Sequence, residues 1–76
     1  MDKRLTFDAT GTVCPIPILK TAQKILEIEV GEIIEILADD EGALEDFPAW
    51  CEQSGNEYLG VEEGADILKF YIRRRV

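Results

Sequence analysis

Apolar and polar positions along the chain change their period near Pro15. Between Arg4 and Thr10, Leu5 and Phe7 alternate with polar residues, which predicts a short strand. After Pro15 the apolar positions recur at i, i+1, i+4, i+7 and i+8, which predicts one buried face of a helix that runs to about Ile28. The residues at these positions are Ile18, Leu19, Ala22, Ile25 and Leu26.

The second half of the chain repeats this change of period and ends in a hairpin. After the stop signal at Gly31, the near-continuous apolar run at residues 32–39 predicts a central strand. A turn at residues 39–42 leads into a second helix, with Leu44, Phe47 and Cys51 on one side and Pro48 expected in its first turn. Strands are predicted at residues 56–62 and 66–73, joined by a turn at residues 63–65.

These elements have the order βαβαββ and predict a two-layer α/β sandwich. Right-handed crossovers make the first three strands parallel, and the final hairpin makes the fourth antiparallel to them. Both helices then cover one face of a four-stranded mixed sheet. Each of strands two and four has two alternating sets of side chains, and the set away from the helices is a candidate surface for a weak homodimer. The first set consists of Ile34, Ile36, Ala38, Leu68, Phe70 and Ile72. The second set consists of Ile33, Leu37, Ile67 and Tyr71.

Composition excludes several classes of function. With 76 residues, 46% of them hydrophobic, the chain is expected to form a single domain over residues 1–76. The stretch M-D-K-R-L-T-F-D has no apolar h-region, and no apolar run approaches membrane-spanning length. We therefore expect a cytoplasmic protein with reduced thiols and no membrane contact. Sixteen acidic and eight basic residues give a net charge of −8, which disfavours direct nucleic-acid binding and favours basic protein partners. There is no histidine, and we expect neither metal nor organic cofactor.

The stretch G-T-V-C-P-I-P at residues 11–17 is the main chemical candidate. Cys14 falls at the N-cap of the first helix or one residue from it, with Pro15 at the first helical position and Pro17 at the third. A helix N-terminus carries about half a positive charge, which stabilises a thiolate, whereas cysteine is a poor cap for stability alone. The N–H groups of Ile16 and Ile18 are the expected partners of the sulfur. The alternative is that Cys14 only fills space in the loop.

Cys51 has the opposite character. It shares a helical face with Leu44 and Phe47, which favours core packing over a role as a resolving thiol. Two thiols 37 positions apart in a chain without histidine also make a poor zinc site.

An ordered set of segments resembles the TusA/SirA/YedF-like family of small sulfur-transfer proteins. The set comprises F-D-A-T-G-T-V-C-P-I-P-I-L-K, G-E before strand two, A-D-D at its end, D-F-P-A-W-C in the second helix and a basic end to strand four. The resemblance implies the sheet order 1-2-4-3. It also implies that Cys14 accepts a sulfane sulfur as a persulfide and passes it on, with Pro15 and Pro17 matching directly and Asp8 and Gly11 shaping the loop.

The resemblance further implies two protein partners: a sulfur donor (a cysteine desulfurase or a rhodanese-like protein) and an acceptor sulfur-relay protein. Members that serve tRNA thiolation tend to have Glu between the prolines and His before strand three, where this chain has Ile16 and Asn56. These two departures disfavour the tRNA-thiolation branch and leave room for YedF-like or sulfur-oxidation relatives. The pathway itself stays open among tRNA thiolation, cofactor biosynthesis and sulfur oxidation.

The predicted topology separates the charges into two ends. Acidic residues gather at the end of the sheet where Cys14 lies, oppose thiolate formation and steer a basic donor; a merely solvated acidic rim is the alternative. The acidic set is Asp39, Asp40, Glu41, Glu62, Glu63 and Asp66, and the basic set at the other end is Lys3, Arg4, Arg73, Arg74 and Arg75.

Two other functions stay open at this point. The same fold could act as a non-catalytic interaction or regulatory module without sulfur chemistry. A redox pair of Cys14 and Cys51 would need their Cα atoms within about 7 Å of each other.

Overall fold

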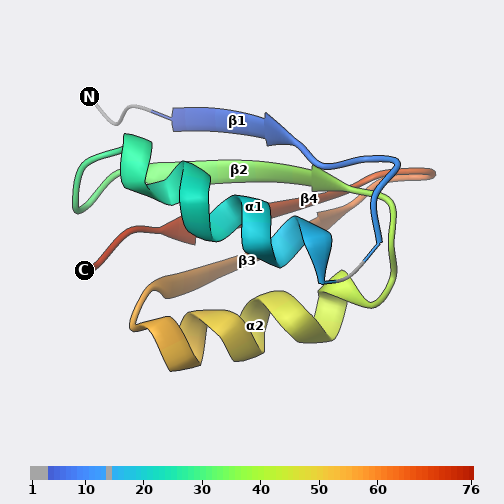
Figure 1. The fold of residues 1–76 in the computed structure, drawn as a ribbon. Coiled ribbons are helices and arrows are strands. Elements are labelled where there is room, and N and C mark those ends of the chain that lie inside the picture. Colours follow the sequence, from blue (N-terminus) through green and yellow to red (C-terminus); the bar gives the residue numbers. More distant parts are fainter. Residues whose placement is uncertain (1–3, 14) are drawn as a thin grey trace.

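The computed structural model describes residues 4–13 and 15–76, and within them the predicted order βαβαββ is confirmed. Strands β1 (Arg4–Asp8), β2 (Ile33–Ala38), β3 (Glu57–Glu63) and β4 (Leu68–Arg73) alternate with helices α1 (Ile16–Lys24) and α2 (Ala43–Ser54). A short 3₁₀ helix, η1 (Ile25–Glu27), extends α1. The sheet has the order β1-β2-β4-β3, with β1 parallel to β2 and β4 antiparallel to both of its neighbours. Both helices lie on one face of it (Figure 1).

The core lies between this helix layer and one set of strand side chains. On β2 and β4 alternate residues point to the helices and are fully buried, as the strand period of two requires. Phe70 packs against Phe47 of α2, with ring centroids 4.6 Å apart and planes tilted by 36°. Burying each ring stabilises the fold by about 2–3 kcal/mol, so this pair fixes α2 against the sheet. The fully buried strand residues are Ile34, Ile36, Ala38, Phe70 and Ile72.

The opposite face of the sheet is more polar than the sequence pattern indicated. At its centre, Glu35 accepts hydrogen bonds from the Thr6 hydroxyl (3.0 Å) and the Tyr71 hydroxyl (2.8 Å). Ile33 is buried, Leu37 is half-buried, and Ile67 lies in the turn before β4. The face proposed for a weak homodimer therefore has a hydrogen-bonded carboxylate at its centre rather than an apolar surface, and the homodimer stays a prediction.

The predicted buried face of α1 is confirmed only in part: Ile25 is buried and Ile18 packs against the core, as expected. Pro17, Thr21 and Ile25 point to the sheet, whereas Leu19 and Leu26 are 59% and 66% exposed. The buried positions follow i, i+4 and i+8, and the change to η1 after Lys24 alters the angle between successive side chains. The predicted face was therefore wrong for its two leucines, and large apolar side chains remain in solvent.

Pro48 was also expected in the first turn of the second helix, and this was wrong. It is the sixth residue of α2, so it leaves the carbonyl of Leu44 without its intrahelical N–H donor. Buried Phe47 and Cys51 hold the helix on both sides of this gap. The helix ends at Gly55, whose φ of 86° is left-handed and whose N–H bonds to the carbonyl of Cys51 at 3.0 Å.

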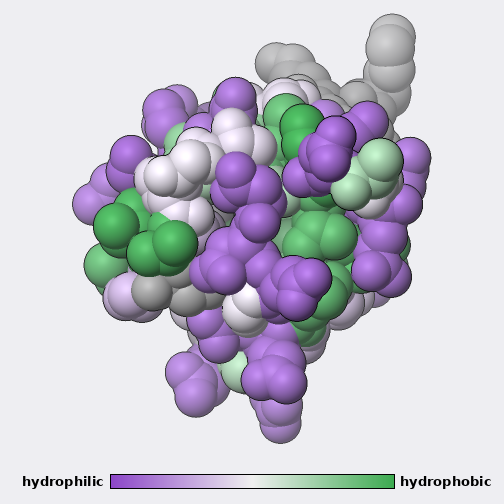
Figure 2. Space-filling model, turned by 90° about the vertical axis from the view of Figure 1, so that its right-hand side faces the viewer, coloured by the Kyte–Doolittle hydropathy of each residue, from purple (hydrophilic) through white to green (hydrophobic). Residues whose placement is uncertain are grey.

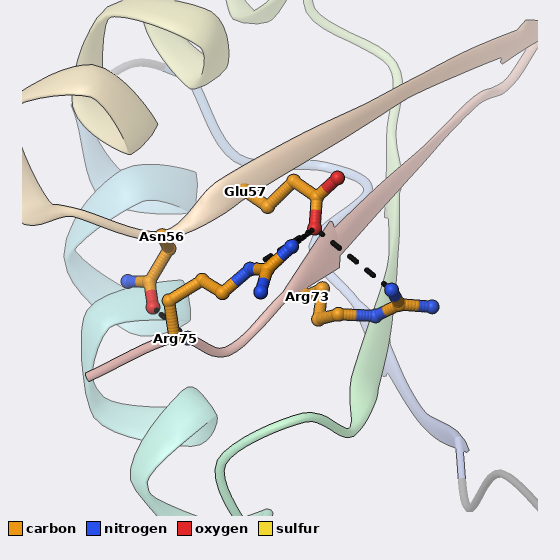
Figure 3. Close-up of polar contacts among 4 residues, drawn as sticks. All are labelled: Asn56, Glu57, Arg73 and Arg75. Carbon is orange, nitrogen blue, oxygen red and sulfur yellow. Dashed lines mark hydrogen bonds and ion pairs between the residues drawn. The ribbon is translucent and has the colours of Figure 1, made fainter.

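The basic end of the sheet is tied together by polar contacts (Figure 3). Glu57 of β3 accepts hydrogen bonds from the Arg75 side chain and lies 3.9 Å from Nη1 of Arg73 on β4. Asn56 accepts a bond from the backbone N–H of Arg75 at 2.9 Å and donates one to Ser54 at 3.1 Å. Asn56, one of the two departures from the tRNA-thiolation pattern, thus joins the end of α2 to the segment that follows β4.

Candidate functional site

The loop between β1 and α1 is held by its own short-range hydrogen bonds. Ala9 is buried, and its N–H continues the sheet by bonding to the carbonyl of Leu37 at 2.7 Å. Asp8 then accepts bonds from the hydroxyl of Thr10 at 2.6 Å and from its N–H at 2.9 Å, which lower the pKa of the Asp8 carboxyl. The hydroxyl of Thr12 donates to the carbonyl of Ala9 at 2.6 Å. These bonds form a compact turn from residue 8 to residue 12.

A contact from Asp39, the residue that follows β2, fixes the apex of this turn. Both carboxylate oxygens of Asp39 lie 3.1 Å from the backbone N of Gly11, whose φ of 80° is in the left-handed region. Only glycine adopts that conformation readily, which gives Gly11 a physical reason to be in the loop. Asp39 therefore couples the end of β2 to the loop. The sequence placed Asp39 in the acidic set but carried no signal for this bond.

The start of α1 differs by one residue from the prediction. Pro15 is the N-cap, with φ −93° and ψ 10°, and Pro17 is the second helical residue rather than the third. The N–H of Ile16 bonds to the carbonyl of Val13 at 2.9 Å, so it does not serve as the free donor that was expected. The first bond from the helix to its cap runs from Leu19 to Pro15 at 3.0 Å. The donor role of Ile18 stays a prediction.

Cys14, the principal candidate, lies outside the described residues. Its neighbours in the chain are at the surface: Pro15 is exposed, and Val13 and Ile16 are 65% and 41% exposed. Among the other predicted site residues, the structure brings Asp8 and Gly11 into one turn and Pro15, Ile16 and Pro17 into the start of α1. Pro17 is buried, which anchors this start against the core.

An acidic pocket lies at the same end of the sheet as the loop. It has a volume of about 360 Å³ and combines four carboxylates with an apolar wall. Asp39 belongs to both the pocket and the loop, through its bonds to Gly11. The predicted gathering of acidic residues at this end is thus observed for four of the six. The lining residues are Asp39, Glu41, Glu63 and Asp66 with Leu44, Gly64, Ala65, Ile67 and Leu68.

Cys51 lies in the core, as expected. It is 2% exposed on the buried side of α2, and burial raises the pKa of its thiol to about 11. A thiol with such a pKa is almost entirely protonated at neutral pH and is a weak nucleophile. The redox alternative depends on the separation of Cys51 from Cys14, and Cys14 lies outside the described residues.

Comparison with known proteins identifies the family. A family model described as "Sulfurtransferase TusA" matches residues 5–74. The chain belongs to this TusA family. The resemblance drawn from its motifs is therefore confirmed, and the chain is a member of a family of sulfur carriers.

Individual TusA-family relatives support this assignment. YrkI of Bacillus subtilis is 42% identical over 68 residues, covering 90% of this chain and 91% of the relative. YrkF of the same organism is 39% identical over 97% of this chain, which spans 40% of that longer protein. The sulfur carrier protein TusA of Allochromatium vinosum is 33% identical, covering 90% of each chain. The crystal structure of a SirA-like protein from Desulfitobacterium hafniense matches with a TM-score of 0.74, 28% identity and coverage of 95% of this chain and 99% of the other.

Two surface features were missed by reasoning from the sequence. Leu19 was assigned to the core, although it is exposed next to the loop. A groove of about 280 Å³ between α1 and α2 is lined by Pro15, Ile18 and Trp50, with Asp46, Ala49 and Gln53. The apolar period of a helix shows that a stripe exists but does not show which side of it faces the sheet, so the sequence held no clear signal for either feature.

Proposed function

We propose that this TusA-family chain carries sulfane sulfur as a persulfide on Cys14, taking it from a donor protein and passing it to an acceptor protein. The observation that carries the proposal is the start of α1: Pro15, the residue that follows Cys14, is the helix cap, and the residues on both sides of Cys14 are exposed. A sulfur anion attached near a helix N-terminus is stabilised by the partial positive charge there.

The transfer needs no external oxidant or reductant. The Cys14 thiolate attacks the outer sulfur of the donor persulfide, a new S–S bond forms, and the donor cysteine leaves as a thiolate. In the second step an acceptor thiolate attacks the outer sulfur on Cys14, and the Cys14 thiolate is released. Each step exchanges one S–S bond for another, so the chain ends in its starting state.

The described residues support roles in holding the reacting loop. Asp8 and Gly11 form the turn that precedes Cys14, and Pro15 and Pro17 restrict the backbone that follows it. Ile16 directs its N–H to Val13, which closes the last turn before the helix. In this proposal these five residues position the thiol and take no part in bond exchange.

We place this carrier in the cytoplasm and expect it to make no direct contact with nucleic acid. A carrier of this kind works with a reduced thiol, as in the cytoplasm. No helix of the described chain is long and apolar enough to cross a bilayer. The net charge of −8 opposes binding to phosphate backbones.

Intact-mass spectrometry tests the proposal. The protein is incubated either with inorganic polysulfide or with a cysteine desulfurase and cysteine, and Cys14→Ala and Cys51→Ala are treated in parallel. We expect wild type and Cys51→Ala to gain the mass of one sulfur atom and Cys14→Ala to gain none. Sulfur addition to Cys14→Ala at the wild-type level would refute the assignment. We expect a Cys14→Ser variant to take up no sulfur but to bind its partners normally. Wild-type protein that binds partners but never takes up sulfur would instead favour the interaction module.

A further inference from the structure

Strand β1 forms one edge of the sheet, and no strand of the described chain pairs with its outer side (Figure 1). Its register with β2 is unbroken over the whole strand. The N–H of Ala9 bonds inward to the carbonyl of Leu37 at 2.7 Å. Because successive residues of a strand turn their N–H and C=O groups to opposite sides, those of Thr6 and Asp8, both exposed residues, point outward. Strand β1 therefore presents a regular row of hydrogen-bonding groups on which another strand can pair.

The other edge of the sheet, strand β3, is blocked against such pairing. A β-bulge interrupts its register with β4 between Tyr58 and Gly60. Two β3 strands paired antiparallel about Gly60, the middle residue, would place Glu57 opposite Glu63 of the second copy. Like charges directly opposite each other destabilise a strand pair, and a bulge twists an edge away from a partner. Of the two edges in the described sheet, β1 alone is regular.

The sequence of β1 is complementary to itself. The strand reads R-L-T-F-D, with a basic residue at one end, an acidic residue at the other and Thr6 in the middle. In an antiparallel pair centred on Thr6, Arg4 of each copy lies opposite Asp8 of the other. Leu5 then lies opposite Phe7. Opposite charges and apolar residues at facing positions stabilise antiparallel strands, so this pattern favours a second copy and specifies its direction.

Two other surfaces fit a second copy poorly. Figure 2 shows the end of the molecule that carries the acidic pocket, with hydrophilic side chains across its middle. Two such ends would repel each other, because each brings four carboxylates to the contact. The open face of the sheet has the hydrogen-bonded carboxylate of Glu35 at its centre. The edge of β1 differs from both, since its charges attract those of a copy.

We propose that two copies of this chain pair through β1, antiparallel and centred on Thr6, and join their four-stranded sheets into one continuous sheet. The outward residues at positions 4, 6 and 8 of the two copies then exchange about six backbone hydrogen bonds. The contact is isologous and closes at two copies. Because one strand pair is a small interface, and each copy has a net charge of −8, we expect a weak dimer with a dissociation constant of about 100 µM.

Sedimentation velocity over a concentration series measures this association. From about 10 µM to about 1 mM, we expect wild-type protein to shift from monomer to dimer and to form nothing larger. A monomer over the whole range would refute the proposal. Species that grow beyond a dimer would also refute it, because pairing of β1 on β3 of the next copy leaves an open edge at each end.

Two substitutions at Thr6 separate the backbone contact from the side chain. Thr6→Val and Thr6→Pro both remove the hydroxyl that bonds to Glu35. Proline also removes the outward N–H, a change that an edge strand tolerates because no bond of its own sheet is lost. We expect Thr6→Val to dimerise as wild type does and Thr6→Pro to lose the dimer, with a native far-UV circular dichroism spectrum. Dimerisation of folded Thr6→Pro at the wild-type level would place the contact elsewhere.

Complementary charge variants test the register without proline. Arg4→Glu and Asp8→Lys each place like charges opposite each other in a homodimer, so we expect each variant alone to lose the dimer. An equimolar mixture of the two restores opposite charges at both ends and should recover it. Lys69→Glu on β4 makes the same change of charge as Arg4→Glu, with β2 between it and β1, and should dimerise as wild type does at physiological ionic strength.

The outcomes of the charge variants decide the register. A mixture that stays monomeric, or a Lys69→Glu variant that dissociates as Arg4→Glu does, would refute the antiparallel pairing about Thr6. The dimer and the carrier function are also tested separately, because pairing through β1 involves no sulfur chemistry. Failure of polysulfide to load wild type would leave the dimer standing, and a strictly monomeric wild type that loads sulfur would leave the carrier function standing.

Discussion

The hydroxyl group of Thr21 gives the sharpest test of how α1 packs on the sheet. Thr21 is fully buried on the sheet-facing stripe of α1, and its Oγ1 has no hydrogen-bond partner among the described residues. A helical threonine commonly bonds to the carbonyl four residues earlier, which makes the missing partner unusual. Replacing Thr21 with Val keeps the shape of the side chain and removes the polar atom.

The expected effect is stabilising. An unsatisfied buried hydroxyl costs about 1–3 kcal/mol, while Val and Thr have nearly the same helix propensity. The Thr21→Val variant should therefore gain about 1–2 kcal/mol in free energy of unfolding. With a urea m-value of about 1 kcal/mol/M for a domain of this size, the midpoint should rise by about 1–2 M. Equilibrium unfolding can be followed by the fluorescence of Trp50, the single tryptophan.

A second threonine provides the control. The hydroxyl of Thr12 donates to the carbonyl of Ala9 at 2.6 Å, so Thr12→Val should lose about 1 kcal/mol by the same measurement. Opposite signs for the two variants would support the packing of α1. A midpoint for Thr21→Val at or below that of wild type, with an unchanged m-value, would show that this hydroxyl has a partner and that the stripe is placed wrongly.

Three further predictions concern the second thiol, the loop and the basic end of the sheet. Cys51 should resist a water-soluble disulfide reagent until the protein unfolds. Its pKa is about 11 in the fold and 9.0 for a free thiol, so the unfolded chain loses this proton first and the free energy of unfolding should fall by about 2 kcal/mol between pH 9 and 11. In Cys51→Ala this contribution to the fall should be absent. Gly11→Ala and Gly31→Ala both force a side chain into a left-handed conformation with no atom in the way, so each should cost about 1–2 kcal/mol by urea unfolding, but only Gly11→Ala should slow sulfur loading. Glu57→Gln removes surface ion pairs with Arg73 and Arg75 and should cost less than about 1 kcal/mol, with the difference disappearing at high salt. The first prediction is contradicted if the disulfide reagent labels both thiols equally in the native state. The second is contradicted if the two glycine variants load sulfur at equal rates. The third is contradicted if Glu57→Gln lowers the free energy of unfolding by a large amount that does not depend on salt.

The order of the elements and the relative directions of the strands could be predicted because strands and helices differ in period and because parallel crossovers have one hand, whereas the sheet order came from the family resemblance. The alternation at Ile34, Ile36 and Ala38 placed these residues on one side of β2, and the structure shows that this side meets the helices. The segments around Cys14 identified the family, since an ordered set of motifs is far more specific than a cysteine before a proline.

The exposure of Leu19 and Leu26 and the bonds of the loop could not be predicted, for physical reasons. Leu19 and Leu26 are as apolar as any core residue, and only the packing of the short helix on the sheet decides that they face solvent. The bond from Gly11 to Asp39 joins residues 28 positions apart, and no local pattern encodes it. Pro48 lies inside α2 because tertiary packing outweighs an unfavourable local preference.

The position of the carried sulfur tests the central claim most directly. Wild-type protein loaded with polysulfide is alkylated, digested and sequenced by mass spectrometry, so that the extra sulfur is assigned to one of two peptides. We expect the persulfide on the peptide that contains Cys14, with Cys51 alkylated only after unfolding and without added sulfur. Extra sulfur on the peptide of Cys51, or none on that of Cys14, would contradict the account.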